Sequence, residues 1–597
     1  AILGTGALST ALIVASLFVG EQTATAATSS YDINTLAGKV ASLHGTAGLQ
    51  IRFSAFIEQE ANDEGLAPLQ VDGPTLAADT NPLLPPAVTV NQDTGGAPQN
   101  ETAIAVDPNN PNRIVAAAND YVTRTWDCTL PDGTACGALG DAYSGTYFSN
   151  DGGKTWGAKS SDPQHPGTLI PGVTHLLGGS YDGGGDPSLA FDSKGNVYYA
   201  GLGFDRSSAP NTVEVSPGSF DSAGALHWSQ PTFINATTSK SVFNDKEWIA
   251  ADYHSSSPYR DRVYVTWTRF VFNPQNGKFV NSPILEAHSS DGGKTFSTPK
   301  AISANVHYGS GSNVLTGPDG TVYVFYDGAT RLSTVDSTYM VKSTDGGDTW
   351  STPVQVSPLA EIDTPADTAF RVNSFPAAAL ASDGTLYSTW STYLNDNATG
   401  VGSADFCTGD AKSCHAQSVY SRSTDGGAHW SAPAPVPGTN VGRTAVGYAG
   451  SGQNPPAAKP ADSVFPSVAA GQNGSVYFGS YVGDVVSPWQ SCTTYSTGSL
   501  GCTKLGPQVD NAKLDYVVST PAGAVRKAST APINTRYGFQ GTFIGDYTDL
   551  AVGSDGVVHP LWTDTSNEQT VTHWLGKTYN PGVLITQQDV ATNPLRF

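Results

Sequence analysis

One eight-residue pattern occurs four times in this chain and constrains its fold more than any other feature. It reads S-N-D-G-G-K-T-W from Ser149, S-S-D-G-G-K-T-F from Ser289, S-T-D-G-G-D-T-W from Ser343 and S-T-D-G-G-A-H-W from Ser423. Paired glycines allow positive φ angles, and an Asp side chain can accept hydrogen bonds within its own turn. A chain of 597 residues that repeats such a turn is expected to fold as an array of similar units.

A longer pattern surrounds these turns. It consists of a strand of small residues, a turn that in most copies is D-G or N-G, and a strand rich in β-branched and aromatic residues. It begins at Thr102, Pro187, Glu247, Asn313, Pro376, Pro466 and Thr548. Each such hairpin is followed by a loop and further strands. Four antiparallel strands per unit, arranged around a ring, make a β-propeller. We therefore predict an all-β propeller of four-stranded antiparallel blades, with seven blades, or six if the last two units share one.

The N-terminal part of the chain differs from the repeats. Residues 1–20 are mostly apolar and are followed by small residues, including Ala24-Thr25-Ala26. We interpret residues 1–29 as a secretory signal peptide, with an uncleaved N-terminal anchor as the alternative. Residues 30–90 then form an N-terminal extension and linker, and residues 91–597 the propeller. The segment Val88-Thr-Val-Asn-Gln is predicted to add an outer strand to the last blade and so close the ring.

Charge and cysteine content narrow the partners and the compartment. With 52 acidic and 30 basic residues, the formal charge of −22 disfavours nucleic acid and anionic membrane surfaces as partners. The six cysteines form three close pairs, which in an exported chain indicate local disulfides better than zinc sites. The predicted disulfides are Cys128–Cys136, Cys407–Cys414 and Cys492–Cys502. We expect a secreted, monomeric protein.

The octapeptide resembles the Asp-box, or bacterial neuraminidase repeat, of the sialidase superfamily. Its Asp residues are structural in that family, and the resemblance implies the same for Asp151, Asp291, Asp345 and Asp425. It also implies that these turns lie on the face opposite the active site. The functional face would then collect the loops that enter the first strand of each blade and those that leave the second.

The loops on that face supply the candidate site residues. A sialidase binds its anionic sugar through arginines, uses an Asp as acid/base, and uses a Tyr nucleophile activated by a Glu. The candidate catalytic residues here are Glu101, Asp186, Asp245, Tyr537, Asp546 and Tyr547. The candidate substrate-binding residues are Arg124, Trp126, Arg206, Arg269, Arg331, Arg371, Trp489 and Arg536.

Several interpretations of the acidic residues stay open. Aligned on the small residue of each inner strand, Glu101, Asp186, Asp245 and Asp546 fall four or five positions before it and would converge near the axis. Such carboxylates can act as general acid and base, can hold Ca²⁺ through several oxygens, or can simply cap their own turns. No cofactor is required for the first role, and Ca²⁺ is the candidate cofactor for the second.

The resemblance implies a secreted sialidase-like glycoside hydrolase that acts on a glycan or glycoprotein, with acidic sugars among the candidate substrates. A non-catalytic propeller that binds carbohydrate or protein is the alternative, because the R-I-P motif of sialidases is missing. A polysaccharide lyase is a third hypothesis, for which His307-Tyr308 is the only candidate base pair.

Overall fold

The structure is a computed structural model. It describes residues 86–91, 98–121, 143–157, 168–205, 210–331, 336–362, 372–407, 414–443, 459–483, 513–535, 544–574 and 577–597. The predicted signal peptide and nearly all of the N-terminal extension lie outside these residues. Within the described ranges, no helix has the length and apolar character needed to cross a membrane.

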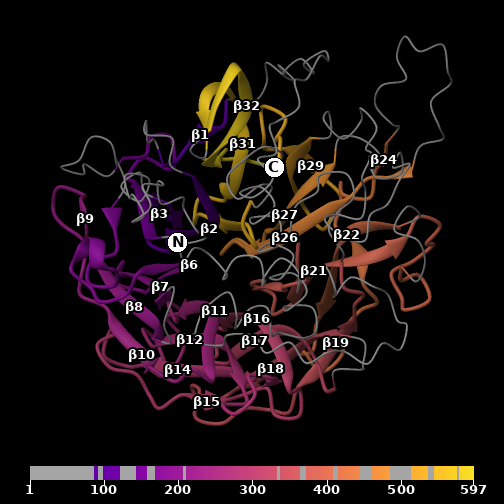
Figure 1. The fold of residues 1–597 in the computed structure, drawn as a ribbon. Coiled ribbons are helices and arrows are strands. Elements are labelled where there is room, and N and C mark those ends of the chain that lie inside the picture. The colour runs from indigo at the N-terminus through magenta and orange to yellow at the C-terminus, as the bar shows by residue number, and fades with distance from the viewer. Residues whose placement is uncertain are drawn as a thin grey trace, which may run out of the picture.

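Seven antiparallel sheets surround a central axis, so the prediction of a seven-bladed propeller is confirmed (Figure 1). The first strand of each blade is the innermost. In chain order these inner strands are β2 (Gln99–Asp107), β6 (Gly183–Phe191), β11 (Val242–Ala251), β16 (Tyr308–Thr316), β20 (Ala377–Leu380), β26 (Ser463–Ala470) and β30 (Asp549–Val552).

The remaining strands complete each blade outward. Blade 1 adds β3 (Asn110–Asp120), β4 (Tyr143–Ser149) and β5 (Thr168–Leu169), and blade 2 adds β7 (Val197–Phe204), β8 (Asn211–Phe220), β9 (Leu226–Trp228) and β10 (Thr232–Thr237). Blade 3 adds β12 (Val263–Phe272), β13 (Phe279–Asn281), β14 (Ile284–Ser289) and β15 (Lys300–Ala301), and blade 4 adds β17 (Val322–Ala329), β18 (Ser337–Ser343) and β19 (Val354–Pro358). Blade 5 adds β21 (Leu386–Asn395), β22 (Cys414–Ser423) and β23 (Ala434–Pro435), and blade 6 adds β27 (Val476–Gly483), β28 (Leu514–Ser519) and β29 (Val525–Lys527). A short pair, β24 (Gly442–Arg443) and β25 (Lys459–Pro460), precedes blade 6, and one 3-10 turn, η2 (His175–Leu177), precedes blade 2.

The last blade is built from both ends of the propeller. Its strands β30, β31 (Val558–Trp574) and β32 (Lys577–Thr592) are completed by β1 (Val88–Thr89). Val88 pairs with Thr592, and Thr89 pairs with Ala591. The predicted closing strand is therefore confirmed. Beyond the blade, β31 and β32 continue as a long hairpin that projects from the ring (Figure 1).

The core lies between blades rather than at the axis. The described residues form one large hydrophobic cluster at each of the seven interfaces between neighbouring blades. Between blades 1 and 2, for example, Ala103 and Val115 pack with Leu189 and Tyr199. The small residues of the inner strands allow seven sheets to approach one another, and burial of the larger side chains between sheets stabilises the ring.

The four Asp-box turns join the third and fourth strands of blades 1, 3, 4 and 5, as predicted. In blade 3, the Asp291 carboxylate accepts bonds from the Thr295 amide at 2.9 Å and the Thr295 hydroxyl at 2.6 Å. These bonds lower the pKa of Asp291 to about 2. Gly292 and Gly293 have φ angles of 75° and 78°. The Asp-box is therefore a self-contained turn, and the prediction that its Asp residues are structural agrees with these contacts.

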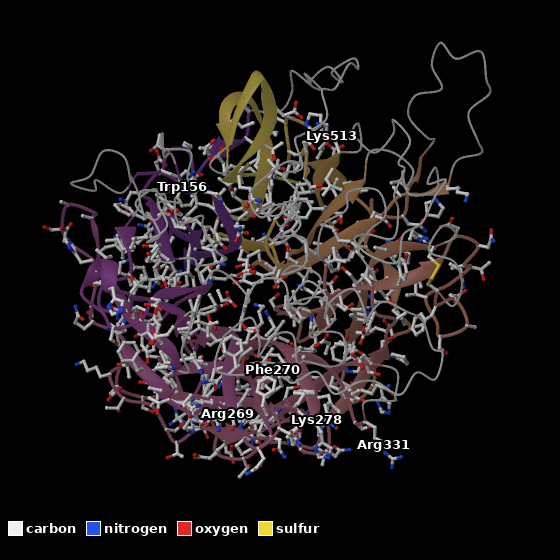
Figure 2. All side chains as sticks on the ribbon, viewed as in Figure 1. Trp156, Arg269, Phe270, Lys278, Arg331 and Lys513 are labelled. Carbon is white, nitrogen blue, oxygen red and sulfur yellow. A yellow bond between two sulfur atoms is a disulfide. The ribbon has the colours of Figure 1, made fainter. Side chains whose placement is uncertain are left out.

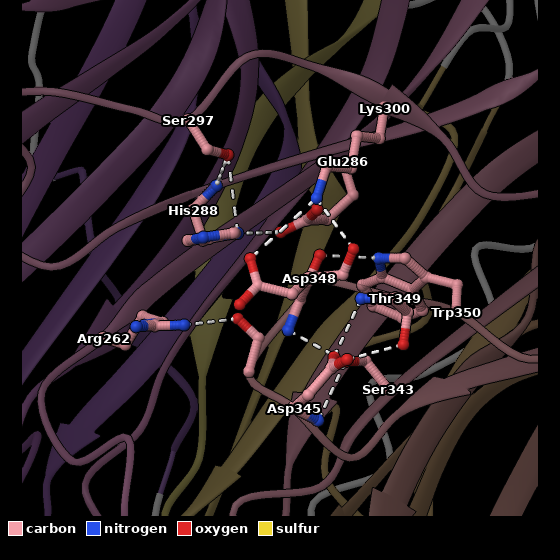
Figure 3. Close-up of polar contacts among 12 residues, drawn as sticks. Arg262, Glu286, His288, Ser297, Lys300, Ser343, Asp345, Asp348, Thr349 and Trp350 are labelled. Carbon is pink, nitrogen blue, oxygen red and sulfur yellow. Dashed lines mark hydrogen bonds and ion pairs between the residues drawn. The ribbon is translucent and has the colours of Figure 1, made fainter.

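The Asp-box turns also fasten each blade to the one before it. Arg262 in blade 3 donates to the Gly346 carbonyl in blade 4 at 2.6 Å, and Lys342 in blade 4 donates to the Gly426 carbonyl in blade 5 at 2.8 Å. Figure 3 shows the Asp-box turn of blade 4, which contains Asp345, with Glu286, His288 and Lys300 of blade 3 around it. The repeated octapeptide therefore holds the ring together on one face.

One predicted disulfide falls within the described residues. Cys407 and Cys414 are joined, with their Cα atoms 5.8 Å apart, between the second and third strands of blade 5. This prediction is confirmed. Cys128, Cys136, Cys492 and Cys502 lie outside the described residues, and their pairing stays a prediction.

Candidate functional site

The inner strands share an irregularity on the face opposite the Asp-boxes. In blades 1, 2, 3, 4 and 6, the pairing between the first and second strands shifts by one residue near the start of the inner strand. The first residue of each of these bulges has a positive φ. These residues are Glu101 (55°), Asp186 (55°), Lys246 (49°), Gly311 (62°) and Phe465 (51°).

The residue types at the first position of this bulge are unusual. When that position has a left-handed φ it is normally occupied by glycine, and Gly311 occupies it in blade 4. A side chain in that conformation costs about 1–2 kcal/mol. Three successive blades nevertheless place an ionisable side chain at this position, namely Glu101, Asp186 and Lys246. Strain of this kind is concentrated at functional sites, and the bulges therefore define the candidate site.

Asn119 links the first two of these residues. This buried side chain, at the end of β3, donates from Nδ2 to Glu101 Oε2 at 2.7 Å. Its Oδ1 accepts the backbone N–H of Asp186, also at 2.7 Å. Glu101 is buried, whereas Asp186 is partly exposed. One amide group therefore spans the interface between blades 1 and 2 and contacts both acidic positions.

Lys246 occupies the centre of the site. Its Nζ lies 3.7 Å from the ring centroid of Tyr547 and 4.3 Å from that of Trp248, a double cation–π contact. Tyr547 comes from blade 7, and its hydroxyl donates across the axis to the Pro187 carbonyl of blade 2 at 3.2 Å. Lys246 and its two aromatic partners therefore connect blades 2, 3 and 7 at the axis.

Burial and charge compete at Lys246. Burial lowers the pKa of this ammonium group, while four nearby carboxylates, those of Glu247, Asp186, Glu101 and Asp546, act in the opposite direction. The adjacent Glu247 is fully buried, and neither of its carboxylate oxygens has a hydrogen-bond partner. Burial, reinforced by Asp186, raises the pKa of Glu247 well above its ordinary value. The site thus contains acids in different environments, as acid–base chemistry requires.

A second buried acid lies behind this group. Glu214 on β8 is fully buried, and its Oε2 accepts a bond from Ser216 at 3.0 Å. Desolvation raises the pKa of Glu214 to about 8. Tyr199 on β7 is equally buried, and its hydroxyl has no hydrogen-bond partner. Burial and the charges of Glu214, Glu247 and Asp186 raise its pKa well above the usual range.

A small cavity opens beside Lys246 at the axis. Its volume is about 30 Å³, enough for one or two water molecules. Lys246, Trp248, Phe375, Asp546 and Tyr547 are among the residues that line it. Glu101 and Asp186 are not among the residues that line this cavity.

The structure places the predicted acidic residues differently from one another. Glu101 and Asp186 occupy the bulge position, and Asp546 and Tyr547 line the axial cavity. Asp245 instead lies just before the bulge of blade 3, where it pairs with Thr268 on β12. The axial position in that blade belongs to Lys246. The sequence contained the whole N-D-K-E-W segment, but spacing alone did not distinguish the lysine from its acidic neighbours.

Two of the predicted substrate-binding arginines fall within the described residues. Arg269 and Arg331 both lie toward the outside of the ring rather than at its axis (Figure 2). Arg331 is exposed. Burial lowers the pKa of Arg269, which is half-buried. The structure does not bring these two arginines to the axial group. The other candidates on this face lie outside the described residues: Arg124, Trp126, Arg206, Arg371, Trp489, Arg536 and Tyr537.

The structure also shows where the residues considered for lyase chemistry lie and whether the described acidic residues form a metal site. His307 is exposed, and the Tyr308 ring packs on Phe279 with a centroid distance of 5.8 Å. Neither residue is among those lining the axial cavity. Among the residues that the structure describes, no group of three or more His, Cys, Asp or Glu side chains has the arrangement of a metal site. A role for Ca²⁺ stays a prediction.

The protein has the fold of a seven-bladed β-propeller of mostly four-stranded antiparallel sheets. One similar solved structure is a protein of unknown function from Dyadobacter fermentans, with 11% identity, 86% of this chain and 99% of that chain covered, and a TM-score of 0.39. A Hadza microbial sialidase has 12% identity, 76% and 74% coverage and a TM-score of 0.38. An α-L-arabinofuranosidase of Fusarium graminearum, solved with arabinobiose, has 12% identity, 86% and 98% coverage and a TM-score of 0.36. No protein-family model and no curated protein matches the chain. At these identities the likeness concerns the fold alone.

Proposed function

We propose that this chain is a secreted glycoside hydrolase of sialidase-like type, with Glu101 and Asp186 as its carboxyl pair. The observation that carries the proposal is the strained bulge at which three successive blades carry ionisable side chains, with the Glu101 and Asp186 carboxylates near enough to Lys246 to act on its pKa. Glycine would fit this backbone at lower cost, as Gly311 does in blade 4. The strained position is occupied by Glu101, Asp186 and Lys246 instead. A role of these side chains in binding a ligand or reacting with it would explain this choice.

The arrangement suits acid–base hydrolysis of a glycosidic bond. In such a reaction one carboxyl group protonates the leaving oxygen while the bond from the anomeric carbon to that oxygen breaks. The other carboxylate either takes a proton from the attacking water or adds first to the anomeric carbon, to be replaced by water in a second step. The partly exposed Asp186 is the member of the pair that a substrate entering from solvent would meet first. Both acids act on the nearby Lys246 by favouring its charged form against the effect of burial.

Water and the aromatic rings complete the proposed site. The axial cavity, which Lys246 lines but Glu101 and Asp186 do not, is large enough for a water molecule beside Lys246. Trp248 and Phe375, which line the cavity, offer apolar surface at its edge, of the kind against which sugar rings pack. Sialic acids are candidate substrates because of the Asp-box resemblance, and neutral sugars are tested beside them.

One observation favours a non-catalytic alternative. The axis is occupied by the contact of Lys246 with Tyr547 and Trp248, and the cavity beside them measures only about 30 Å³. A propeller that binds a glycan or protein on its rim needs no deeper pocket. In this alternative, Lys246 and its acidic neighbours would serve only to join the blades.

The decisive experiment is a hydrolysis screen with sialyl and neutral aryl glycosides, using wild-type protein, Asp186→Asn and Glu101→Gln. The proposal expects turnover by the wild type and a loss of about 10³-fold in kcat/KM in each variant, with unchanged thermal melting. Asp291→Asn is the matched control, because it removes a carboxylate from the opposite face. It should lower the melting temperature and leave kcat/KM unchanged.

The outcomes separate the two functions. Turnover that survives both axial substitutions would overturn the assignment of the carboxyl pair. A folded wild-type protein that cleaves none of the glycosides but binds one of them would support the binding alternative instead.

A further inference from the structure

We propose that Asn119 is a positioning residue that joins Glu101 and Asp186 into one catalytic unit across the interface of blades 1 and 2. This inference rests on the proposed hydrolase function and assigns a role to a residue outside the predicted site. The two hydrogen bonds of its side chain, each 2.7 Å long, are its basis.

The direction of these bonds determines what Asn119 can do. The amide NH₂ group donates to the Glu101 carboxylate, which favours the ionised form of that acid. The amide oxygen accepts the N–H of Asp186, and thus holds the backbone of a residue with a φ of 55°. The amide group of Asn provides a donor and an acceptor on one rigid plane. Asn119 therefore satisfies two different requirements at once.

The surroundings of Asn119 make its geometry rigid. The residue is buried and lies at the end of β3, where Asn119 pairs with Asn100 on one side and Ser144 on the other. Because β3 lies between β2 and β4, strands on both sides hold the backbone of Asn119 in place. Its side chain therefore fixes Asp186 relative to blade 1. A shift of about 1 Å between two reacting groups can cost on the order of 10²-fold in rate. Fixing the interface between two blades is thus a catalytic requirement if the carboxyl pair spans it.

Two substitutions separate the two bonds. Asn119→Asp keeps an acceptor for the Asp186 N–H but faces the Glu101 carboxylate with a second carboxylate. Asn119→Ala removes both bonds. Like charges in contact raise the pKa of a carboxyl group, so the acid limb of the kcat/KM profile should move to higher pH by about one unit in Asn119→Asp. In Asn119→Ala, kcat should fall about 10- to 100-fold while KM changes by less than about threefold.

A measurement of stability tests the contact independently of turnover. At pH 7 the penalty of Asn119→Asp should be relieved when Glu101→Gln is added, because the glutamine amide can donate to the new carboxylate. The unfolding equilibrium constant of the double variant should differ by about tenfold or more from the product of the two single effects. Asn593→Asp is the control, since Asn593 is also buried and donates to the Ala528 carbonyl at 2.9 Å. It should lower stability without moving the pH profile.

Each result decides the inference. Coupling between the two positions together with a shifted pH profile supports it. Additive stability effects, or an acid limb that does not move in an active Asn119→Asp variant, would overturn it while leaving the hydrolase proposal intact. Coupled stability in a protein without any turnover would reduce Asn119 to a structural contact, and in that case the proposed function fails as well.

Discussion

Both faces of the propeller contain residues with positive φ, but the Asp-box turns and the axial bulges carry different residue types at these positions. In the Asp-box turns the left-handed positions are glycines, such as Gly292 and Gly293. On the axial face the equivalent conformation is taken by Glu101, Asp186 and Lys246. Glycine tolerates this conformation without steric cost, whereas other residues lose about 1–2 kcal/mol.

The difference separates structural demands from chemical ones. The Asp-box satisfies its own hydrogen bonds and needs nothing from its surroundings except close contact with the preceding blade. The axial bulges accept strain and bury charge, and both cost stability. Side chains that lower the stability of a fold in this way are expected where they bind a ligand or take part in a reaction.

The strongest test of this contrast is Asp186→Gly. Glycine suits the φ of 55° at this position, so the free energy of unfolding should stay within about 1 kcal/mol of the wild type. Loss of the carboxylate should reduce kcat/KM by about 10³-fold, or roughly 4 kcal/mol of transition-state stabilisation. Chemical denaturation and steady-state kinetics measure the two effects separately. A large loss of stability with normal kinetics would make Asp186 a structural residue.

The pH dependence of stability should show the burial of charge on the axial side. Glu214 has a pKa of about 8 in the folded protein, against an ordinary value of 4.5. The folded state therefore binds the proton more tightly, and this contribution is complete below pH 4.5 and disappears as the pH rises through 8. Between pH 5 and pH 8 it amounts to at most about 4 kcal/mol.

Glu214→Gln isolates this effect. The variant should lose less stability than the wild type between pH 5 and pH 8, as measured by urea denaturation at each pH. Other groups, such as His559, whose pKa is lowered to about 4 by burial, contribute equally to both proteins and cancel in the comparison. Parallel pH profiles for the two proteins would show that Glu214 is not protonated in the fold.

On the Asp-box face the corresponding test is Gly347→Ala. A Cβ atom there would lie 2.7 Å from His288 Nδ1 and 3.0 Å from Glu286 Oε1, at a φ of 97°. Strain and steric overlap together should cost about 3 kcal/mol of stability, with no change in kcat/KM. Gly384→Ala is the matched control, because it has a φ of 85° and nothing within 4 Å of the new atom. It should cost only about 1 kcal/mol, and equal losses in the two variants would contradict a role in blade contact.

The smallest effect is expected at the fourth Asp-box. There His429 replaces the usual Thr and approaches Asp425 through Nδ1 at 2.7 Å. Both side chains are exposed, and His429→Thr restores the arrangement of the other three turns. The melting temperature should change by no more than about 2 °C. A larger change at neutral pH would show that this turn depends on its histidine.

The fold was largely predictable from sequence because its determinants are local. The octapeptide fixes a turn through its own Ser, Asp and glycines, and the hairpins are specified by small inner strands with D-G or N-G turns. Counting these units predicted seven blades, and the position of Val88-Thr-Val-Asn-Gln before the first hairpin suggested the closing strand. The contacts of Gly347 with blade 3 could not be predicted, because they depend on the packing of one blade against another.

The site was predictable only in part. Glu101 and Asp186 were proposed from their spacing to the small residues of the inner strands, and the structure places both at the bulge. In blade 3 the same spacing rule pointed to Asp245, one residue before the position that faces the axis. A bulge changes which side chains share a face, and a shift by one residue reverses the assignment. The role of Asn119 has no sequence signature, because its two partners come from different blades.

The pairing of β1 with β32 has a consequence for how the protein is made. Val88 and Thr89 are synthesised about 500 residues before their partners Thr592 and Ala591. The seventh sheet therefore cannot be completed before β32 has been synthesised, and β1 cannot pair with β32 until then. Contacts of such long sequence separation are slow to form, so we expect the joining of β1 to β32 to be a late step of folding. A chain truncated before β32 would keep the strands of the first six blades but would lack the strand with which β1 pairs, so the ring could not close.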